Sequence, residues 1–144
     1  MKRWITTALA VVLLFVLCSC RSTEEEWQNK ITFAIQNQCD TVIYGLHCEY
    51  SFDGKPYGGQ MLSKNPEMDA PLPQGETLSL SFTAPDLSGV ADLSTAQFEF
   101  YVVLEDQSEI PVGETVSLAV EYGHTYAYTL DGGEQNGFTL TQVF

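Results

Sequence analysis

Basic residues are scarce in this 144-residue chain, which has 6 lysines and arginines against 19 aspartates and glutamates and a net charge of −13. No lysine or arginine follows Lys64. A surface this acidic repels phosphate backbones and anionic lipid headgroups, so we predict no nucleic-acid binding and no electrostatic docking onto a membrane. It favours basic or cationic partners, although the same charge also serves simply to keep a domain soluble and monomeric.

Recognisable catalytic motifs are lacking as well. The two histidines, His47 and His124, belong to no motif, and the chain has no Gly-x-Ser-x-Gly elbow, no phosphate-binding glycine loop and no Cys-x-x-Cys pair. Cys48 follows His47, but adjacent residues of a strand point to opposite faces, so the two cannot form a catalytic pair there. We therefore predict no catalytic residues, no cofactor and no enzyme activity.

The chain has one long apolar run, which lies at the amino end. It covers residues 4–17, short of the ~20 residues that a transmembrane helix needs. Lys2 and Arg3 precede it, and this order of charged and apolar residues is typical of an export signal. The run closes with Leu17-Cys18-Ser19-Cys20, which resembles the lipobox of bacterial lipoproteins, where an aliphatic and a small residue precede the lipid-bearing cysteine.

The lipobox resemblance implies that residues 1–19 are a signal peptide, that Cys20 carries lipid, and that residues 20–29 tether a domain to the membrane. Two or more acyl chains on Cys20 would hold the protein firmly in the membrane, because each buried CH₂ group contributes about 0.8 kcal/mol to membrane binding. The protein would then lie at the extracytoplasmic face of a bacterial cell membrane. The alternative is an ordinary secretory signal, cleaved nearby, which would leave a soluble exported protein.

Helical spacing is nearly absent after Lys30, where apolar and polar residues alternate instead. A period of two is typical of half-buried β-strands. In the longest alternating stretch, residues 41–52, we expect Val42 and Tyr44 to share a buried face with Cys48. The other alternating stretches are residues 31–35, 78–82, 98–104, 116–120, 126–130 and 138–140.

Turn-forming residues such as Asp53-Gly54 and Asp131-Gly132-Gly133 separate these stretches into seven to nine short strands. Residues 30–144 suffice for one domain and are too few for two. Two sheets packed face to face bury alternating strands best, so we predict an all-β fold, a single antiparallel β-sandwich after the N-terminal signal helix. The longest connection, residues 84–96, is the expected variable or functional loop.

The stretch Tyr122-Gly123-His124-Thr125-Tyr126-Ala127-Tyr128 resembles the start of the penultimate strand of fibronectin type III and other immunoglobulin-like domains. Those domains often place a tyrosine there, whose hydroxyl bonds to the backbone a few residues upstream. The resemblance implies an immunoglobulin-like sandwich with Tyr126 or Tyr122 in this role.

Two cysteines, Cys39 and Cys48, remain after Cys20, and an oxidising compartment would favour pairing them. If residues 41–52 form one straight strand, however, about seven steps of ~3.3 Å separate Cys48 from the turn that holds Cys39. Disulfide-linked Cα atoms usually lie within about 6.8 Å. We therefore favour buried free thiols over a disulfide.

Candidate ligand contacts are few. Exposed aromatic side chains can bind glycans by stacking on sugar rings. The candidates for this role are Tyr57, in a turn, and Tyr101, on the outward face of its strand. The acidic tip with Asp131, Glu134 and Asn136 is the candidate calcium site, although its spacing matches no known calcium loop. No other metal site is predicted.

The sequence thus predicts a membrane-anchored, extracytoplasmic binding or structural module without catalytic function. Its partner would be a protein or a glycan of the cell envelope. The alternatives are a glycan-binding or cell-wall-binding domain and an accessory subunit of an envelope complex. The accessory-subunit alternative predicts an exposed apolar patch that includes Tyr101 and Val103.

Overall fold

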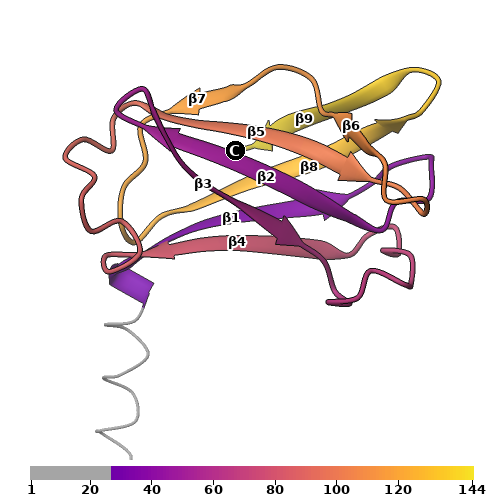
Figure 1. Cartoon of the computed structure of the whole chain (residues 1–144), viewed down its shortest axis with the longest axis horizontal. Helices are drawn as coiled ribbons and strands as arrows, with labels where there is room; N and C mark the ends of the chain where they lie inside the picture. Colours follow the sequence, from indigo (N-terminus) through magenta and orange to yellow (C-terminus); the bar gives the residue numbers. More distant parts are fainter. Residues whose placement is uncertain (1–26) are drawn as a thin grey trace, which may run out of the picture.

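Nine β-strands make up the fold in the computed structural model, which describes residues 27–144 (Figure 1). The strands lie in two sheets, so the predicted all-β sandwich of seven to nine strands is confirmed. None of the described helical residues forms a helix long and apolar enough to cross a membrane. The strands are β1 (Lys30–Asn37), β2 (Gly45–Phe52), β3 (Lys55–Leu62), β4 (Thr77–Thr83), β5 (Ala96–Val103), β6 (Glu109–Pro111), β7 (Val116–Leu118), β8 (Thr125–Gly133) and β9 (Gly137–Val143).

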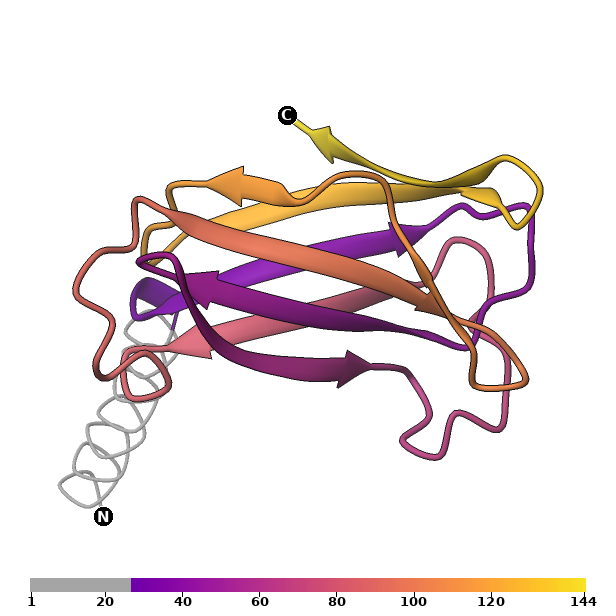
Figure 2. The ribbon, with the colours of Figure 1, turned by 45° about the horizontal axis from the view of Figure 1, so that its top comes forward.

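The first sheet has the order β4-β1-β8-β9 and the second has the order β3-β2-β5-β6, with β7 also paired to β5 (Figure 2). All neighbours are antiparallel except β1 and β8, which run parallel. The antiparallel prediction needs correction at this pair. Alternation indicates which face of a strand is buried, but it carries no information on the direction of a neighbour that lies far away in the sequence.

The chain crosses between the sheets after β1, β3, β4 and β7. β1 lies beside β4 in one sheet, and β2 lies beside β5 in the other. In immunoglobulin-like sandwiches the second strand pairs with the fifth and the third with the sixth in the same way. The spacing of three strands along the chain that relates β1 to β4 and β2 to β5 is the feature that this sandwich shares with the predicted immunoglobulin-like arrangement. β8 lies on the other side of β1, between β1 and the edge strand β9, and it runs parallel to β1.

The core lies between the two sheets and consists of the apolar side of each alternating strand. Phe33 is fully buried at its centre and packs against Phe98, with ring centroids 4.4 Å apart. Because strands such as β1, β4 and β5 contribute alternate residues to this layer, their remaining residues are fixed on the two outer faces. The buried strand residues include Ile31, Ile35, Leu46, Cys48, Leu78, Leu80, Phe82, Phe100, Val102, Leu130 and Phe138.

The long strand expected over residues 41–52 begins only at Gly45. Val42, which was expected to be buried, is 63% exposed, whereas Ile43 is fully buried and pairs with Leu72. The alternation therefore changes phase where the chain crosses between sheets. Gly45, at the start of β2, leaves room for the end of β3, because a Cβ atom there would lie 2.7 Å from the carbonyl oxygen of Leu62.

Cys39 and Cys48 are free and buried, as predicted. Burial raises the pKa of the Cys39 thiol to about 11, with the charges of Asp131 and Asp40 adding to the effect. Burial likewise raises the pKa of Cys48 to about 12, and the charge of Glu49 contributes. Both side chains therefore stay protonated at neutral pH and behave as small apolar residues.

A tyrosine corner lies at the start of β8, and Tyr126 forms it. Its hydroxyl accepts a hydrogen bond from the backbone N–H of Glu121 at 3.0 Å and donates one to the carbonyl of Ala119 at 3.3 Å. Its ring packs against Phe33 in the core, with centroids 5.3 Å apart. One side chain thus ties the segment before β8 to the sandwich, which confirms the expected role of a tyrosine in this stretch.

The first prediction concerns this corner. Tyr126→Phe removes both hydrogen bonds while keeping the ring in place, and should lower the free energy of unfolding by about 1 kcal/mol. Tyr122→Phe is the matched control, because no hydrogen bond of the Tyr122 hydroxyl is among those of the described residues, and it should change stability little. Urea unfolding of both variants tests the assignment, and a larger loss in Tyr122→Phe would contradict it.

Candidate binding face

The candidate site is the outer surface of the second sheet, and the pairing of β2 with β5 creates it. In this register Glu49 lies opposite Glu99, and His47 lies opposite Tyr101. Between these pairs, Cys48 lies opposite Phe100 and points into the core. We call the outward side of β3, β2, β5 and β6 the acidic face; its residues are His47, Glu49, Ser51, Gly59, Met61, Gln97, Glu99, Tyr101, Glu109 and Pro111.

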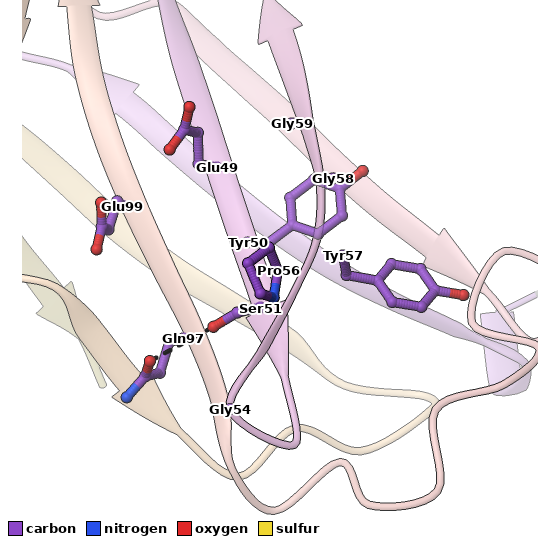
Figure 3. Close-up of a pocket in the computed structure, with 10 residues that line it drawn as sticks. All are labelled: Glu49, Tyr50, Ser51, Gly54, Pro56, Tyr57, Gly58, Gly59, Gln97 and Glu99. Carbon is purple, nitrogen blue, oxygen red and sulfur yellow. Dashed lines mark hydrogen bonds between the residues drawn. The ribbon is translucent and has the colours of Figure 1, made fainter.

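A hollow of about 550 Å³ lies on this face near the β2–β3 hairpin (Figure 3). Glu49 and Ser51 line it from β2, Gln97 and Glu99 from β5, and Gly59 from β3. Gly54, Pro56, Tyr57 and Gly58 of the hairpin and Tyr50 complete the lining. The hollow is therefore open, and it combines the carboxylates of Glu49 and Glu99 with an apolar lining to which Pro56 and Tyr57 contribute.

Glu49 and Glu99 form a like-charge pair directly across two strands. Side chains in this position have Cβ atoms about 5 Å apart, and like charges there destabilise a sheet. Glu99 Oε2 accepts a hydrogen bond from the Tyr101 hydroxyl at 3.1 Å, and Thr115 donates one to Oε1 at 3.4 Å. Among residues 27–144, no hydrogen bond or ion pair is found for the exposed Glu49 carboxylate. The fold therefore retains an electrostatic cost here.

No lysine or arginine of these strands offsets the charge. Lys55 lies opposite Phe52, on the other side of the sheet. The one ion pair on this face within the described part of the chain joins His47 Nδ1 to Glu109 Oε2 at 3.0 Å. The His47 ring also lies beside that of Tyr101, with centroids 5.6 Å apart.

Tyr101 shows how negative the face is. Its hydrogen bond to Glu99 raises the pKa of its phenol, and partial desolvation adds to the shift. The charges of Glu99, Glu49 and Glu109 raise the pKa further. Three carboxylates from three strands therefore act on one aromatic side chain, which stays a neutral hydrogen-bond donor at physiological pH.

A smaller hollow of about 170 Å³ adjoins the first, and Glu99 lines both. It lies where the chain passes from β6 to β7, and Tyr101, Pro111, Glu114 and Thr115 are among its lining residues. The two hollows together extend the negatively charged surface across β5.

The outer surface of the first sheet is different in chemistry. Asp131 is the one carboxylate among its outward strand residues, and Lys30 is the one base. The two outer faces of the sandwich therefore differ in charge. The outward residues of the first sheet include Thr32, Ala34, Gln36, Ser79, Ser81, Thr125, Ala127, Thr129, Thr139 and Thr141.

The two aromatic residues proposed for sugar stacking line different hollows, Tyr57 the larger and Tyr101 the smaller. Tyr101 lies half-buried on the acidic face, as expected from alternation. The Tyr57 hydroxyl donates a hydrogen bond to the carbonyl of Asp86 at 2.9 Å, and its ring packs edge-on against Phe52 at 5.5 Å between centroids. Tyr57 therefore connects β3 to the 84–96 connection and forms no flat platform with Tyr101.

Val103 does not belong to an exposed apolar patch with Tyr101. It is 1% exposed, because the segment after β3 covers this corner of the sheet. The Met68 sulfur lies 3.1 Å from the Cβ position of Gly45, the residue paired with Val103. The predicted patch is therefore wrong at Val103.

The residues proposed for calcium lie at the hairpin between β8 and β9. Asp131, Glu134 and Asn136 are all exposed there. No group of three or more histidine, cysteine, aspartate or glutamate side chains in the described range is placed to hold a metal ion. Calcium binding stays a prediction of the sequence alone.

A hollow of about 670 Å³ lies at the opposite end of the sandwich, where Tyr44, Glu105, Asp106 and Glu134 are among the lining residues. Its carboxylates come from separate loops. The acidic face, by contrast, holds its carboxylates on paired strands, and rigid elements position a binding group more accurately than loops do.

Alternation in the sequence predicts Tyr101 on an outward face but does not reveal the site that it forms with Glu99. Glu49, Ser51, Gln97 and Gly59 were not recognised as site residues. Alternation alone could have placed Glu49 and Gln97 outward, but the pairing that brings β2 beside β5 is set by contacts distant in sequence.

Comparisons with known proteins give remote similarities. No protein-family model matches the chain, and no curated protein matches it. Solved structures that resemble it include a protein from Eubacterium rectale (12% identity, 80% of this chain and 89% of that chain, TM-score 0.43). Another is the membrane-binding domain of pneumolysin (11% identity, 80% and 96%, TM-score 0.41). A third, from Bacteroides ovatus, is described as a "putative cell adhesion protein" (11% identity, 81% and 43%, TM-score 0.45). Similarity this remote indicates no function.

The second prediction follows from the like-charge pair. Glu49→Gln should raise the free energy of unfolding by about 0.2–1 kcal/mol at low salt, because it removes the repulsion from Glu99. The gain should shrink at about 1 M salt, where the screening length falls to ~3 Å. Glu67→Gln, at an exposed loop position, is the control. Urea unfolding that shows Glu49→Gln to be less stable than the parent would contradict the prediction.

Proposed function

We propose that this protein is a lipid-anchored, extracytoplasmic binding module without catalytic function, which presents the acidic face to a partner. The anchor is the lipid on Cys20, a residue outside those that the structure describes. The lipobox resemblance of residues 17–20 and the short preceding apolar run support it. Location by lipid and recognition by the sandwich would then be separate parts of one function.

The segment between anchor and sandwich limits where the partner can be. Residues 21–29 are nine residues, which span at most about 30 Å when fully extended. β1 starts immediately afterwards, at Lys30. An anchored sandwich would therefore meet partners at or close to the membrane surface.

The observation that carries the binding function is the acidic face, which combines an open hollow with Glu49 and Glu99 on rigid strands, neither of which has a cationic partner among residues 27–144. A solubility role alone would need no such concentration on one of the two outer faces. The histidines support a non-catalytic function: within residues 27–144, His47 pairs with Glu109, and exposed His124 lies 3.8 Å from Glu121. Neither contacts a nucleophilic side chain in these pairs.

Glycan binding is the second candidate. Ser51, Gln97 and two glutamates line the hollow, and such side chains bond sugar hydroxyls. The position of Tyr57, which is hydrogen-bonded to Asp86, supports this candidate less than the sequence suggested.

The third prediction tests the anchor. The intact mass of the membrane-extracted protein should correspond to a chain that starts at Cys20 and carries acyl groups. Cys20→Ser should abolish both the added mass and membrane retention, whereas Cys18→Ser, the matched control two residues earlier, should preserve them. An unmodified Cys20, or a chain that starts elsewhere, would overturn the anchor.

A further inference from the structure

We infer that the acidic face binds a basic polypeptide segment, with a lysine or arginine side chain placed between Glu49 and Glu99. The inference rests on the proposed binding function and names its ligand. The side chains of the face, the shape of the hollow and the distribution of charge over the molecule each support it.

The first support is electrostatic. Glu49 and Glu99 lie directly opposite each other, and no cationic side chain of the described residues is paired with either. Removing one charge would relieve the repulsion without loss of a buried contact, since both residues are exposed. An ammonium or guanidinium group between the two carboxylates would turn this cost into attraction, and a guanidinium could bond both through its planar donors.

The second support is the space beside Glu49. Gly59 lies opposite Glu49 on β3, so the row across the sheet reads glycine, glutamate, glutamate. A Cβ atom at Gly59 would lie 3.2 Å from His47 Nε2 and 3.7 Å from Glu49 Cγ. A side chain there would crowd the face. Its absence leaves the Glu49 carboxylate open to an incoming group.

The third support is the aromatic side chain at the centre of the face. Tyr101 lies on the same side of β5 as Glu99 and donates its hydroxyl proton to that carboxylate. An aromatic ring attracts a cation placed over it, and nearby carboxylates strengthen that attraction. Tyr101 therefore adds a contact that suits a cationic side chain with an apolar stem.

The shape of the surface favours a polypeptide over a single ion. The two hollows meet at Glu99, so the negatively charged surface runs across β2 and β5 towards Glu114. A calcium ion would need six or more oxygen ligands around one point, and no grouping of three carboxylate, histidine or cysteine side chains occurs in the described part of the chain. An extended basic segment can place successive cationic groups along such a surface.

The charge distribution also selects the partner. The acidic face carries Glu49, Glu99 and Glu109, whereas Asp131 is the one outward carboxylate of the strands of the first sheet. A negative charge that served only to keep protein molecules apart would not need to be concentrated on one of the two outer faces. Such a face repels phosphates and anionic headgroups, which leaves a basic protein segment as the macromolecular partner that it fits.

The fourth prediction tests this ligand with acetylated tetralysine amide, titrated into the membrane-extracted protein in detergent micelles by calorimetry. Binding should be saturable and should weaken strongly between about 20 mM and 150 mM salt, because exposed charges are screened. Glu49→Gln with Glu99→Gln should weaken it about tenfold or more, which corresponds to about 1.4 kcal/mol. Glu67→Gln with Glu134→Gln changes net charge equally away from the face and should leave affinity within about twofold.

Three results would overturn the inference: no saturable binding, equal weakening by both double variants, or displacement of the peptide by millimolar calcium with direct calcium binding in its place. If protein whose Cys20 is lipidated shows no saturable peptide binding, the proposed basic ligand is wrong and the proposed lipid anchor stands. If Cys20 is unlipidated and peptide binding is retained, the lipid anchor is wrong and the basic ligand stands. Unfolding midpoints of both double variants verify that the compared proteins are folded.

Discussion

The antiparallel pairing of β2 with β5 is the interaction on which the rest of the structure depends. It sets Cys48 against Phe100 inside the sandwich and Glu49 against Glu99 outside it. Because a strand alternates its side chains between two faces, the core cannot form in this register without placing those two glutamates side by side. Core packing and surface charge are therefore consequences of the same register.

The charge pair is stable because packing on the other side of the sheet outweighs it. Phe98, Phe100 and Val102 of β5 are all buried, and each contributes about 1.5–3 kcal/mol relative to exposure. Repulsion between two exposed carboxylates amounts to less than about 1 kcal/mol. The core thus holds the carboxylates on a rigid scaffold, which is what the proposed binding function requires.

Much of the fold could be predicted from the sequence, because alternation is a local property. It identified the buried faces of β1, β4, β5 and β8, and the resemblance near Tyr126 identified the corner. Features that depend on contacts distant in sequence were missed. They include the parallel pairing of β1 with β8, the phase change at Gly45, the covering of Val103, and the row of Gly59, Glu49 and Glu99. The residue types indicate the negative charge of the site, but its position depends on the register of β2 with β3 and β5.

The central claim is that the acidic face is the surface at which a partner binds. Backbone-amide chemical-shift mapping of the isotope-labelled protein during titration with a basic peptide tests it most directly. The account predicts that the largest shifts fall in β2, β3 and β5 around Glu49, Gly59 and Glu99, while the threonine-rich outer face of β1, β8 and β9 stays unchanged. Largest shifts on that face, or at the hollow beside Tyr44 and Glu105, would contradict the claim.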